Sequence, residues 1–164
     1  KNNDVNFKLS VINPTGVLGP SLSSDVGTSN ALILRMLNGS MPALVKLHVG
    51  IVDVRDVAKA HILAMESDQA NGERFIVSAK EMWMDEIAHV LNSDGYKAPQ
   101  KNMPNWLLKI MAWFKSDLVV LSKMVGKPRD CHTTKAKDIL DWKPRPAEGS
   151  ILETARQLKQ YELI

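Results

Sequence analysis

GIVDVRDVAKAHILAM, residues Gly50 to Met65, is the stretch that decides the fold class. An apolar, β-rich run from Leu44 to Val52 passes directly into a segment whose apolar residues recur at the spacing of one helix face. Asp53 is suited to cap the N-terminus of that helix, and Asp56 follows in its first turn, where a carboxylate is favourable. We therefore predict a strand that feeds a helix, and the predicted inner face of the helix carries Val57, Ala58, His61, Ile62 and Met65.

Strand and helix signals alternate on both sides of this stretch. Before it, an alternating run from Phe7 to Ile12 predicts a strand, and Ala31–Leu37 predicts a helix that ends at Asn38-Gly39. After it, ERFIVSA (residues 73–79) predicts a strand. A helix follows around Asp85–Leu91, with its apolar side at Ile87, Ala88 and Leu91. Such alternation favours an α/β layered fold with parallel strand pairing.

The second half of the chain follows a helical pattern. Residues 104–114 and 118–125 predict two helices rich in Trp and Met, and a short helix is expected to end at Leu140 before a stiff, proline-rich linker. Ser150 and Glu153 have the spacing of a capping box at the start of a last helix, whose inward side is expected to carry Ile151, Ala155 and Leu158. The large apolar side chains of the first two helices suit either a core or the wall of an apolar pocket, and the sequence leaves both interpretations open.

The loop NPTGVLGP, Asn13–Pro20, follows the first predicted strand and contains two glycines. A dinucleotide phosphate loop needs three glycines, because only glycine lets the backbone approach the pyrophosphate. Gly16 and Gly19 have suitable spacing, but Leu22 occupies the third position and Pro20 intervenes. The loop is therefore predicted to be a plain turn or a ligand-contacting loop, not a phosphate cradle.

Composition excludes several classes of protein. The 164 residues fit one domain, and 45% hydrophobic and 24% charged residues are typical of a globular protein. The net charge of +3 comes from interspersed charges, so we expect no nucleic-acid partner. The single cysteine, Cys131, forms no internal disulfide and favours a reducing compartment. Without an 18-residue apolar run or a secretory leader, the chain is expected to be cytoplasmic with no membrane partner.

Familiar catalytic and metal-binding patterns are absent from the sequence. The four histidines show no pairing at helical spacing, so no metal site is expected. The chain has no G-x-S-x-G motif, and the adjacency of Cys131 and His132 does not by itself create a nucleophile and its base.

Three segments, LSVINPTGVLGP (residues 9–20), GIVDVRDVAKAHILAM (50–65) and GERFIVSAKEMWMDEIAHVL (72–91), together resemble the C-terminal half of an extended or atypical short-chain dehydrogenase/reductase. The nearest group is the dihydroflavonol-4-reductase-like part of the NAD-dependent epimerase/dehydratase superfamily, and TTKAKDILDWKPRPAEGSILETARQL (133–158) is similar to its closing segment. The resemblance implies an α/β fold: the C-terminal part of a Rossmann-type NAD(P)-binding fold with a small, mostly helical substrate-binding subdomain. In this single fragment, residues 1–78 would supply the last strands and helices of the cofactor-binding sheet, interleaved with substrate loops. Residues 79–164 would form the helical subdomain.

The resemblance also implies a site. Pro14 and Val17 would contact the nicotinamide end of NADP (or NAD), with Ser29 near the cofactor phosphates, so this fragment would touch that end of the cofactor only. The implied pocket for a small carbonyl or alcohol substrate contains Leu22, Trp106, Met111, Trp113 and Met124.

The family's Tyr-x-x-x-Lys pair is missing from this sequence. Gln100 stands four residues after Tyr96, and Tyr161 lies too close to the end of the chain for a lysine four residues on. We therefore expect a fragment of a carbonyl or dihydroflavonol-type reductase that has no catalytic residue of its own, is inactive alone, and can associate with itself through exposed apolar surface. A fragment of a nucleotide-sugar epimerase or dehydratase, and a non-catalytic interaction module on the same fold, remain as alternatives.

Overall fold

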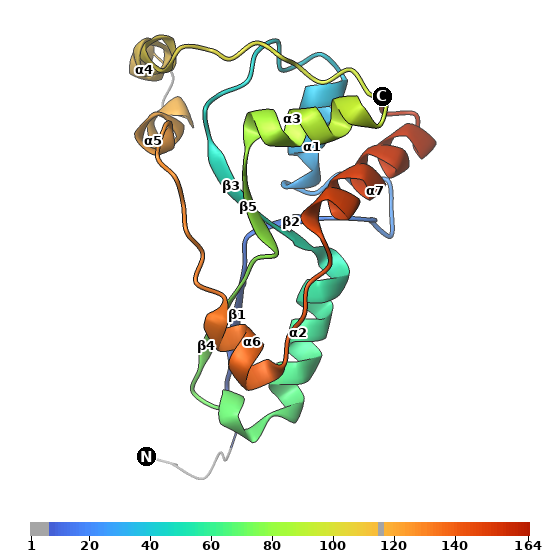
Figure 1. Cartoon of the computed structure of the whole chain (residues 1–164), viewed down its shortest axis with the longest axis vertical. Coiled ribbons are helices and arrows are strands. Elements are labelled where there is room, and N and C mark those ends of the chain that lie inside the picture. The colour runs from blue at the N-terminus through green and yellow to red at the C-terminus, as the bar shows by residue number, and fades with distance from the viewer. Residues whose placement is uncertain (1–6, 115–116) are drawn as a thin grey trace.

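The computed structural model describes residues 7–114 and 117–164, and Figure 1 shows how its elements are arranged. The described elements are, in chain order, β1 (Val11–Pro14), β2 (Gly16–Leu18), α1 (Asn30–Leu37), β3 (His48–Asp53), α2 (Val54–Glu66), a 3₁₀ turn (Asp68–Ala70), β4 (Arg74–Val77), β5 (Lys80–Trp83), α3 (Met84–Ser93), α4 (Asn105–Phe114), α5 (Asp117–Met124), α6 (Thr134–Leu140) and α7 (Ala147–Gln160).

Two small sheets connect these elements. β1 pairs with β4 in parallel, with Val11 opposite Arg74 and Pro14 opposite Val77. β2 pairs in parallel with β3, and β5 runs antiparallel along the other edge of β3. The predicted α/β fold with parallel pairing is confirmed. The short strands β2 and β5 were not predicted, because runs of three and four residues carry little periodicity.

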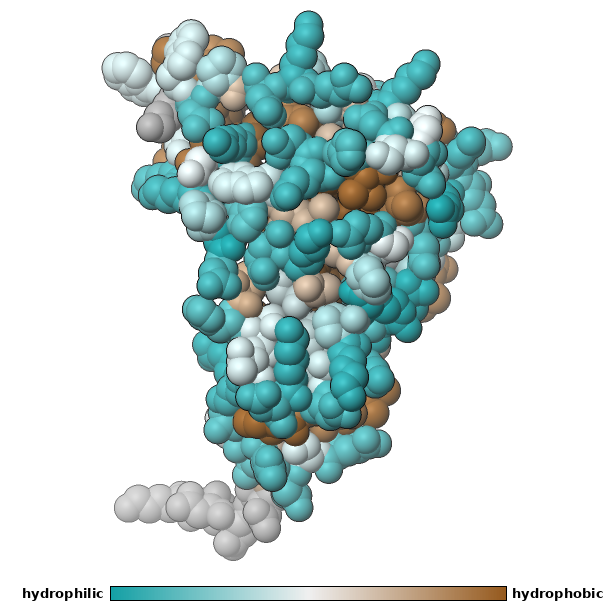
Figure 2. Space-filling view, in the orientation of Figure 1, coloured by the Kyte–Doolittle hydropathy of each residue, from teal (hydrophilic) through white to brown (hydrophobic). Residues whose placement is uncertain are grey.

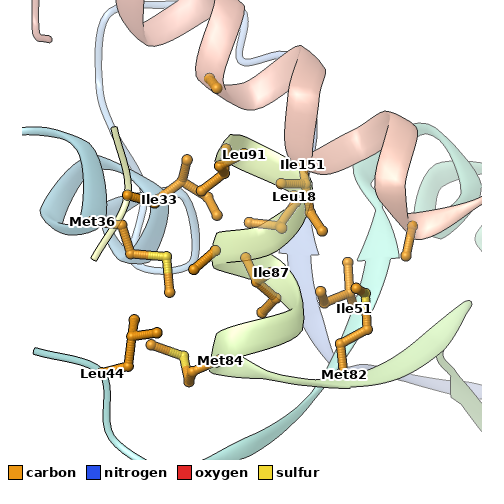
Figure 3. Close-up of a cluster of buried hydrophobic side chains, with 14 of the residues drawn as sticks. Leu18, Ile33, Met36, Leu44, Ile51, Met82, Met84, Ile87, Leu91 and Ile151 are labelled. Carbon is orange, nitrogen blue, oxygen red and sulfur yellow. The ribbon is translucent and has the colours of Figure 1, made fainter. Parts of the chain in front are cut away.

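The larger apolar core lies where α1, α3 and α7 pack around β2, β3 and β5, in the upper part of Figure 1. Figure 3 shows its side chains converging on α3 from the surrounding helices and strands. α3 contributes Ile87, Ala88 and Leu91, which is the apolar side that the sequence predicts. Ile151, Ala155 and Leu158 of α7 are likewise buried, as predicted.

A second, smaller core lies between the β1–β4 sheet and the helices α2 and α6. Phe75 and Val77 of β4 point into it, and the fully buried Trp142 closes it on the side of α6. The linker that follows α6 is therefore part of the core rather than a free connection.

The predicted inner face of α2 is wrong except at Val57, which packs against the second core. The helix begins after Asp53 as expected, but it buries Asp56, Ala60 and Ala64, whereas Ile62 and Met65 are exposed. The sequence prediction followed the helical spacing of the larger apolar side chains, such as Ile62 and Met65. In the structure small alanines face inward, because α2 packs closely against the β1–β4 sheet and α6.

The predicted capping box of the last helix is also wrong. α7 begins at Ala147, after Pro146, so Ser150 and Glu153 lie inside the helix. Their side chains instead reach Asp53 and Arg55 at the β3–α2 junction. The side chains of Ser150 and Glu153 therefore make contacts with a distant part of the chain instead of capping their own helix.

Candidate functional site

A cavity of about 430 Å³ opens beside the carboxyl ends of β1 and β4, the side of a parallel sheet where ligands bind in α/β proteins. Its apolar wall comes from Leu18, Leu32, Val49 and Ile51, and its polar groups come from Thr15, Thr28, Ser29, Arg129 and Cys131. An apolar cleft with a few polar groups is the usual form of a small-molecule site.

Two glycines allow the chain to close tightly beside this cavity. A Cβ on Gly50 would lie 2.7 Å from Thr15 Cγ2 and 2.9 Å from Ser78 Oγ, and a Cβ on Gly16 would lie 2.9 Å from the Gly50 carbonyl oxygen. The loop after β1 therefore packs directly on β3 only because both positions lack a side chain. This contact fixes Thr15, whose backbone N–H donates to the Val77 carbonyl over 3.2 Å.

A buried carboxylate fixes the strand–helix junction behind the cavity. Asp53 Oδ1 accepts hydrogen bonds from the backbone N–H and the Nε of Arg55, at 2.9 and 2.8 Å. Ser150 Oγ donates to Asp53 Oδ2 over 2.7 Å. Burial alone would raise the pKa of Asp53, but the hydrogen bonds from Arg55 and Ser150 outweigh it and lower the pKa to about 2. Asp53 is therefore an ionised structural group and the expected helix cap.

Asp56 holds the linker between α6 and α7. Its side chain accepts from the backbone N–H of Arg145 over 2.7 Å, and its carbonyl oxygen accepts from Trp142 Nε1 over 2.9 Å. Asp53 and Asp56 are thus each engaged in fixing the C-terminal segment.

Cys131 lines the cavity and is half-buried. Burial raises the pKa of its thiol, and the neighbouring Glu81 raises it further, so the group is a protonated thiol at neutral pH. His132 is exposed. The cavity therefore contains no activated cysteine nucleophile among the described residues.

The structure brings together some of the site residues implied by the resemblance. Pro14 and Ser29 both line the cavity. Val17 packs instead against the second core, opposite Val52 of β3. Leu22 stands fully exposed on the loop before α1.

Trp106, Trp113 and Met124, three of the four implied substrate residues on α4 and α5, do not line the cavity. Trp106 and Trp113 are exposed on α4, and Met124 is half-buried at the end of α5. Met111 belongs to α4, but its side chain lies outside the described residues. Their role in a substrate pocket stays a prediction.

Several cavity residues were missed by the sequence analysis. Thr15 adjoins the predicted Pro14 and could have been included with it. Arg129 and Cys131 reach the cavity from more than 75 residues beyond Gly50, and no local motif marks such a contact. Only the path of the segment between α5 and α6 brings them there.

No family model matches the chain. Several individual proteins are nevertheless similar to it in sequence. The NADPH-dependent methylglyoxal reductase GRE2 of Saccharomyces cerevisiae is 30% identical over 96% of the chain and 45% of the relative. A putative dihydroflavonol 4-reductase of Synechocystis is 31% identical over 79% of the chain and 39% of the relative. The chain thus spans less than half the length of these curated relatives.

A solved structure matches the chain over a similar range. Yeast methylglyoxal/isovaleraldehyde reductase Gre2, complexed with NADPH, matches with a TM-score of 0.65 and 27% identity. The match covers 96% of the chain and 45% of that protein. The similarity in sequence and in fold therefore extends over nearly the whole of the described structure.

Proposed function

Because the chain belongs to the extended short-chain dehydrogenase/reductase family, we propose that it forms the substrate-side part of an NADPH-dependent reductase of small carbonyl compounds. In this proposal residues 1–78 contribute strands and loops of the Rossmann-type sheet, and residues 79–164 contribute the helical substrate-binding part. The observation that carries the proposal is the cavity at the carboxyl ends of β1 and β4, lined by Pro14 and Ser29.

The cavity suits one end of a dinucleotide. Its volume of about 430 Å³ lies at the lower end of the range for small-molecule sites, roughly 300–1,000 Å³. The apolar wall of Leu18, Val49 and Ile51 is compatible with an apolar ring face, and the hydroxyl groups of Thr28 and Ser29 can donate to phosphate oxygens. When bound, NADPH would supply the hydride. The chain would hold and orient the nicotinamide end and exclude water from it.

We further propose that this chain alone is catalytically inactive. Reduction of a carbonyl requires a proton for the developing alkoxide, and a positioned acid accelerates that step by about 10²–10⁴-fold. The sequence has no Tyr-x-x-x-Lys pair. The acid would come from a segment equivalent to the other half of the relatives.

Cofactor binding can be tested on the 164-residue chain by saturation-transfer difference NMR with NADP⁺. We expect the nicotinamide ring protons to receive more saturation than the adenine protons. A Ser29→Asp substitution should weaken binding about tenfold or more, because it places a carboxylate near the phosphates. Ser40→Asp, an equal charge change on an exposed turn, is the matched control. Equal saturation of the nicotinamide and adenine protons, or equal effects of the two variants, would contradict the proposal that the cavity binds the nicotinamide end.

Turnover is tested with the same preparation by following NADPH absorbance in the presence of methylglyoxal. We expect no rate above the uncatalysed reaction. A kcat/KM of about 10⁴ M⁻¹s⁻¹ or more for the chain alone would overturn the proposed inactivity. An interaction module without cofactor chemistry would show no saturation transfer from the chain to NADP⁺, and this result would overturn the reductase proposal as well.

A further inference from the structure

Helices α4 and α5 form a hairpin at one corner of the molecule (Figure 1). On α4, Trp106, Ile110 and Trp113 have the i, i+4, i+7 spacing of one helix face, and the two tryptophans are 63% and 87% exposed. Val119 and Val120 of α5 are also exposed. We call these five residues the hairpin patch, and brown and near-white atoms mark this corner in Figure 2.

The hairpin patch is not the inner surface of the hairpin. Leu108 and Ala112 of α4, with Val125 after α5, are already buried. The hairpin is attached to the body at its base, where the N–H of Gly126 donates to the Lys46 carbonyl over 2.8 Å and that of Met103 to the Leu44 carbonyl over 2.7 Å. The patch is therefore separate from the buried side chains of the hairpin, and exposed apolar surface of this kind commonly marks an interaction site.

Positive charge is concentrated around the hairpin. Residues 97–129 carry seven of the 21 basic residues and only one of the 18 acidic residues, so this segment has a net charge of +6 and the rest of the chain −3. Lys101, Lys123 and Lys127 are exposed, and none of them forms an ion pair with a described residue. Residues 97–129 thus carry both the hairpin patch and exposed lysines that form no ion pair with a described residue.

In contrast to the expectation of no membrane partner from the sequence, we propose that the hairpin patch docks on the surface of an anionic phospholipid bilayer. Tryptophan prefers the boundary between headgroups and acyl chains, and lysines beside it are attracted to anionic lipid headgroups. α4 has ten residues, about half of what a spanning helix needs. Across residues 7–114 and 117–164, no helix has the length and apolar character needed to cross a bilayer. The hairpin would lie in the interface.

Charge favours a lipid surface over a second copy of the chain. Two hairpin patches brought face to face would place two +6 segments against each other, and this repulsion would oppose the apolar contact. An anionic bilayer would bury the apolar side chains at its interface and attract the lysines to its headgroups. The inference goes beyond the proposed reductase function, and it uses two tryptophans, Trp106 and Trp113, that the resemblance assigns to the substrate pocket.

The first test uses flotation of the 164-residue chain with vesicles of phosphatidylcholine alone or with about one-third phosphatidylserine, at ~0.1 M salt. We expect binding to the mixed vesicles and at least tenfold weaker binding to phosphatidylcholine alone. The double variant Trp106→Ala/Trp113→Ala should lose binding at least tenfold. Ile62→Ala/Met65→Ala, which truncates two exposed apolar side chains on α2, should bind as the parent chain does.

The charge requirement is tested with Lys123→Glu/Lys127→Glu. At about fivefold in affinity per lysine near an anionic surface, this reversal should weaken binding at least about twentyfold. Lys59→Glu/Lys137→Glu makes the same change in net charge at exposed positions of α2 and α6, away from the hairpin, and is the matched control. Equal losses for the two pairs would show a general charge effect and overturn the proposed docking surface.

A measurement without substitutions completes the test. Brominated phosphatidylcholine in the mixed vesicles should quench the tryptophan fluorescence of the parent chain. Absence of quenching would overturn the proposal even if a variant failed to fold. The proposal also fails if the hairpin variants leave vesicle binding unchanged but lower the sedimentation coefficient of the lipid-free chain, because the patch would then join copies of the chain.

Discussion

At the residue scale, Asp53 links parts of the chain that are nearly one hundred residues apart. Its carboxylate accepts from Arg55 in α2 and from Ser150 in α7, and Arg55 also forms a 2.6 Å ion pair with Glu153. A buried carboxylate is tolerated here because each of its oxygens has hydrogen-bond donors. The junction that supports the cavity therefore depends on one ionised group.

This arrangement predicts an acid-sensitive stability. The pKa of Asp53 falls from 3.8 to about 2 on folding, so its ionised form stabilises the fold above pH 4, and the contribution is lost as the pH falls through 2. That difference corresponds to about 2 kcal/mol. We expect Asp53→Asn to be less stable than the parent at pH 6, and the gap to shrink by about 2 kcal/mol at pH 2.

Urea denaturation followed by circular dichroism at several pH values measures this gap. Asp141→Asn, which changes an exposed aspartate just after α6, is the control and should give a nearly constant difference from the parent. A gap for Asp53→Asn that does not change with pH would mean that Asp53 is not the group responsible.

At the element scale, the C-terminal segment is fixed to the rest of the chain by the linker between α6 and α7. Trp142 is 1% exposed, fills the second core and donates its Nε1 hydrogen to the Asp56 carbonyl in α2. The adjoining Arg145 N–H donates to the Asp56 side chain. α2 therefore positions both helices that flank the linker.

We predict distinct costs for two substitutions at Trp142. Trp142→Phe keeps most of the apolar volume but removes the hydrogen bond from Nε1 to the Asp56 carbonyl, at a cost of about 0.5–1.5 kcal/mol. Trp142→Ala also leaves a cavity, so its cost should be about 3–5 kcal/mol. The free energies of unfolding of both variants measure these costs. Trp106→Phe, on the exposed face of α4, is the control, and a similar loss there would contradict the core role of Trp142.

At the scale of the whole molecule, the β1–β4 sheet is covered on one side only by described residues. Phe75 and Val77 face α2 and α6, whereas Arg74 and Ile76 on the other face of β4 are exposed. Parallel strands are normally covered on both faces and have both neighbours. Figure 1 shows this sheet at the margin of the fold.

We predict that this open face makes the 164-residue chain self-associate at high concentration. Ile76→Lys should shift the chain toward monomer in sedimentation velocity experiments, because it places a charge on the open face without touching the second core. Val120→Lys on α5 is the matched control and should leave the distribution unchanged. If Val120→Lys dissociates the oligomer and Ile76→Lys does not, the association runs through the hairpin instead.

The sequence by itself determined the layered α/β fold, the order of the long elements and the inner faces of α3 and α7, because these follow from periodicity within one element. It also pointed to Pro14 and Ser29, through resemblance to a family. Tertiary structure decided the inner face of α2, the roles of Ser150 and Glu153, and the presence of Arg129 and Cys131 at the cavity. Each of these features depends on contacts between parts of the chain that are far apart in sequence. Such contacts cannot be inferred from local spacing or side-chain type.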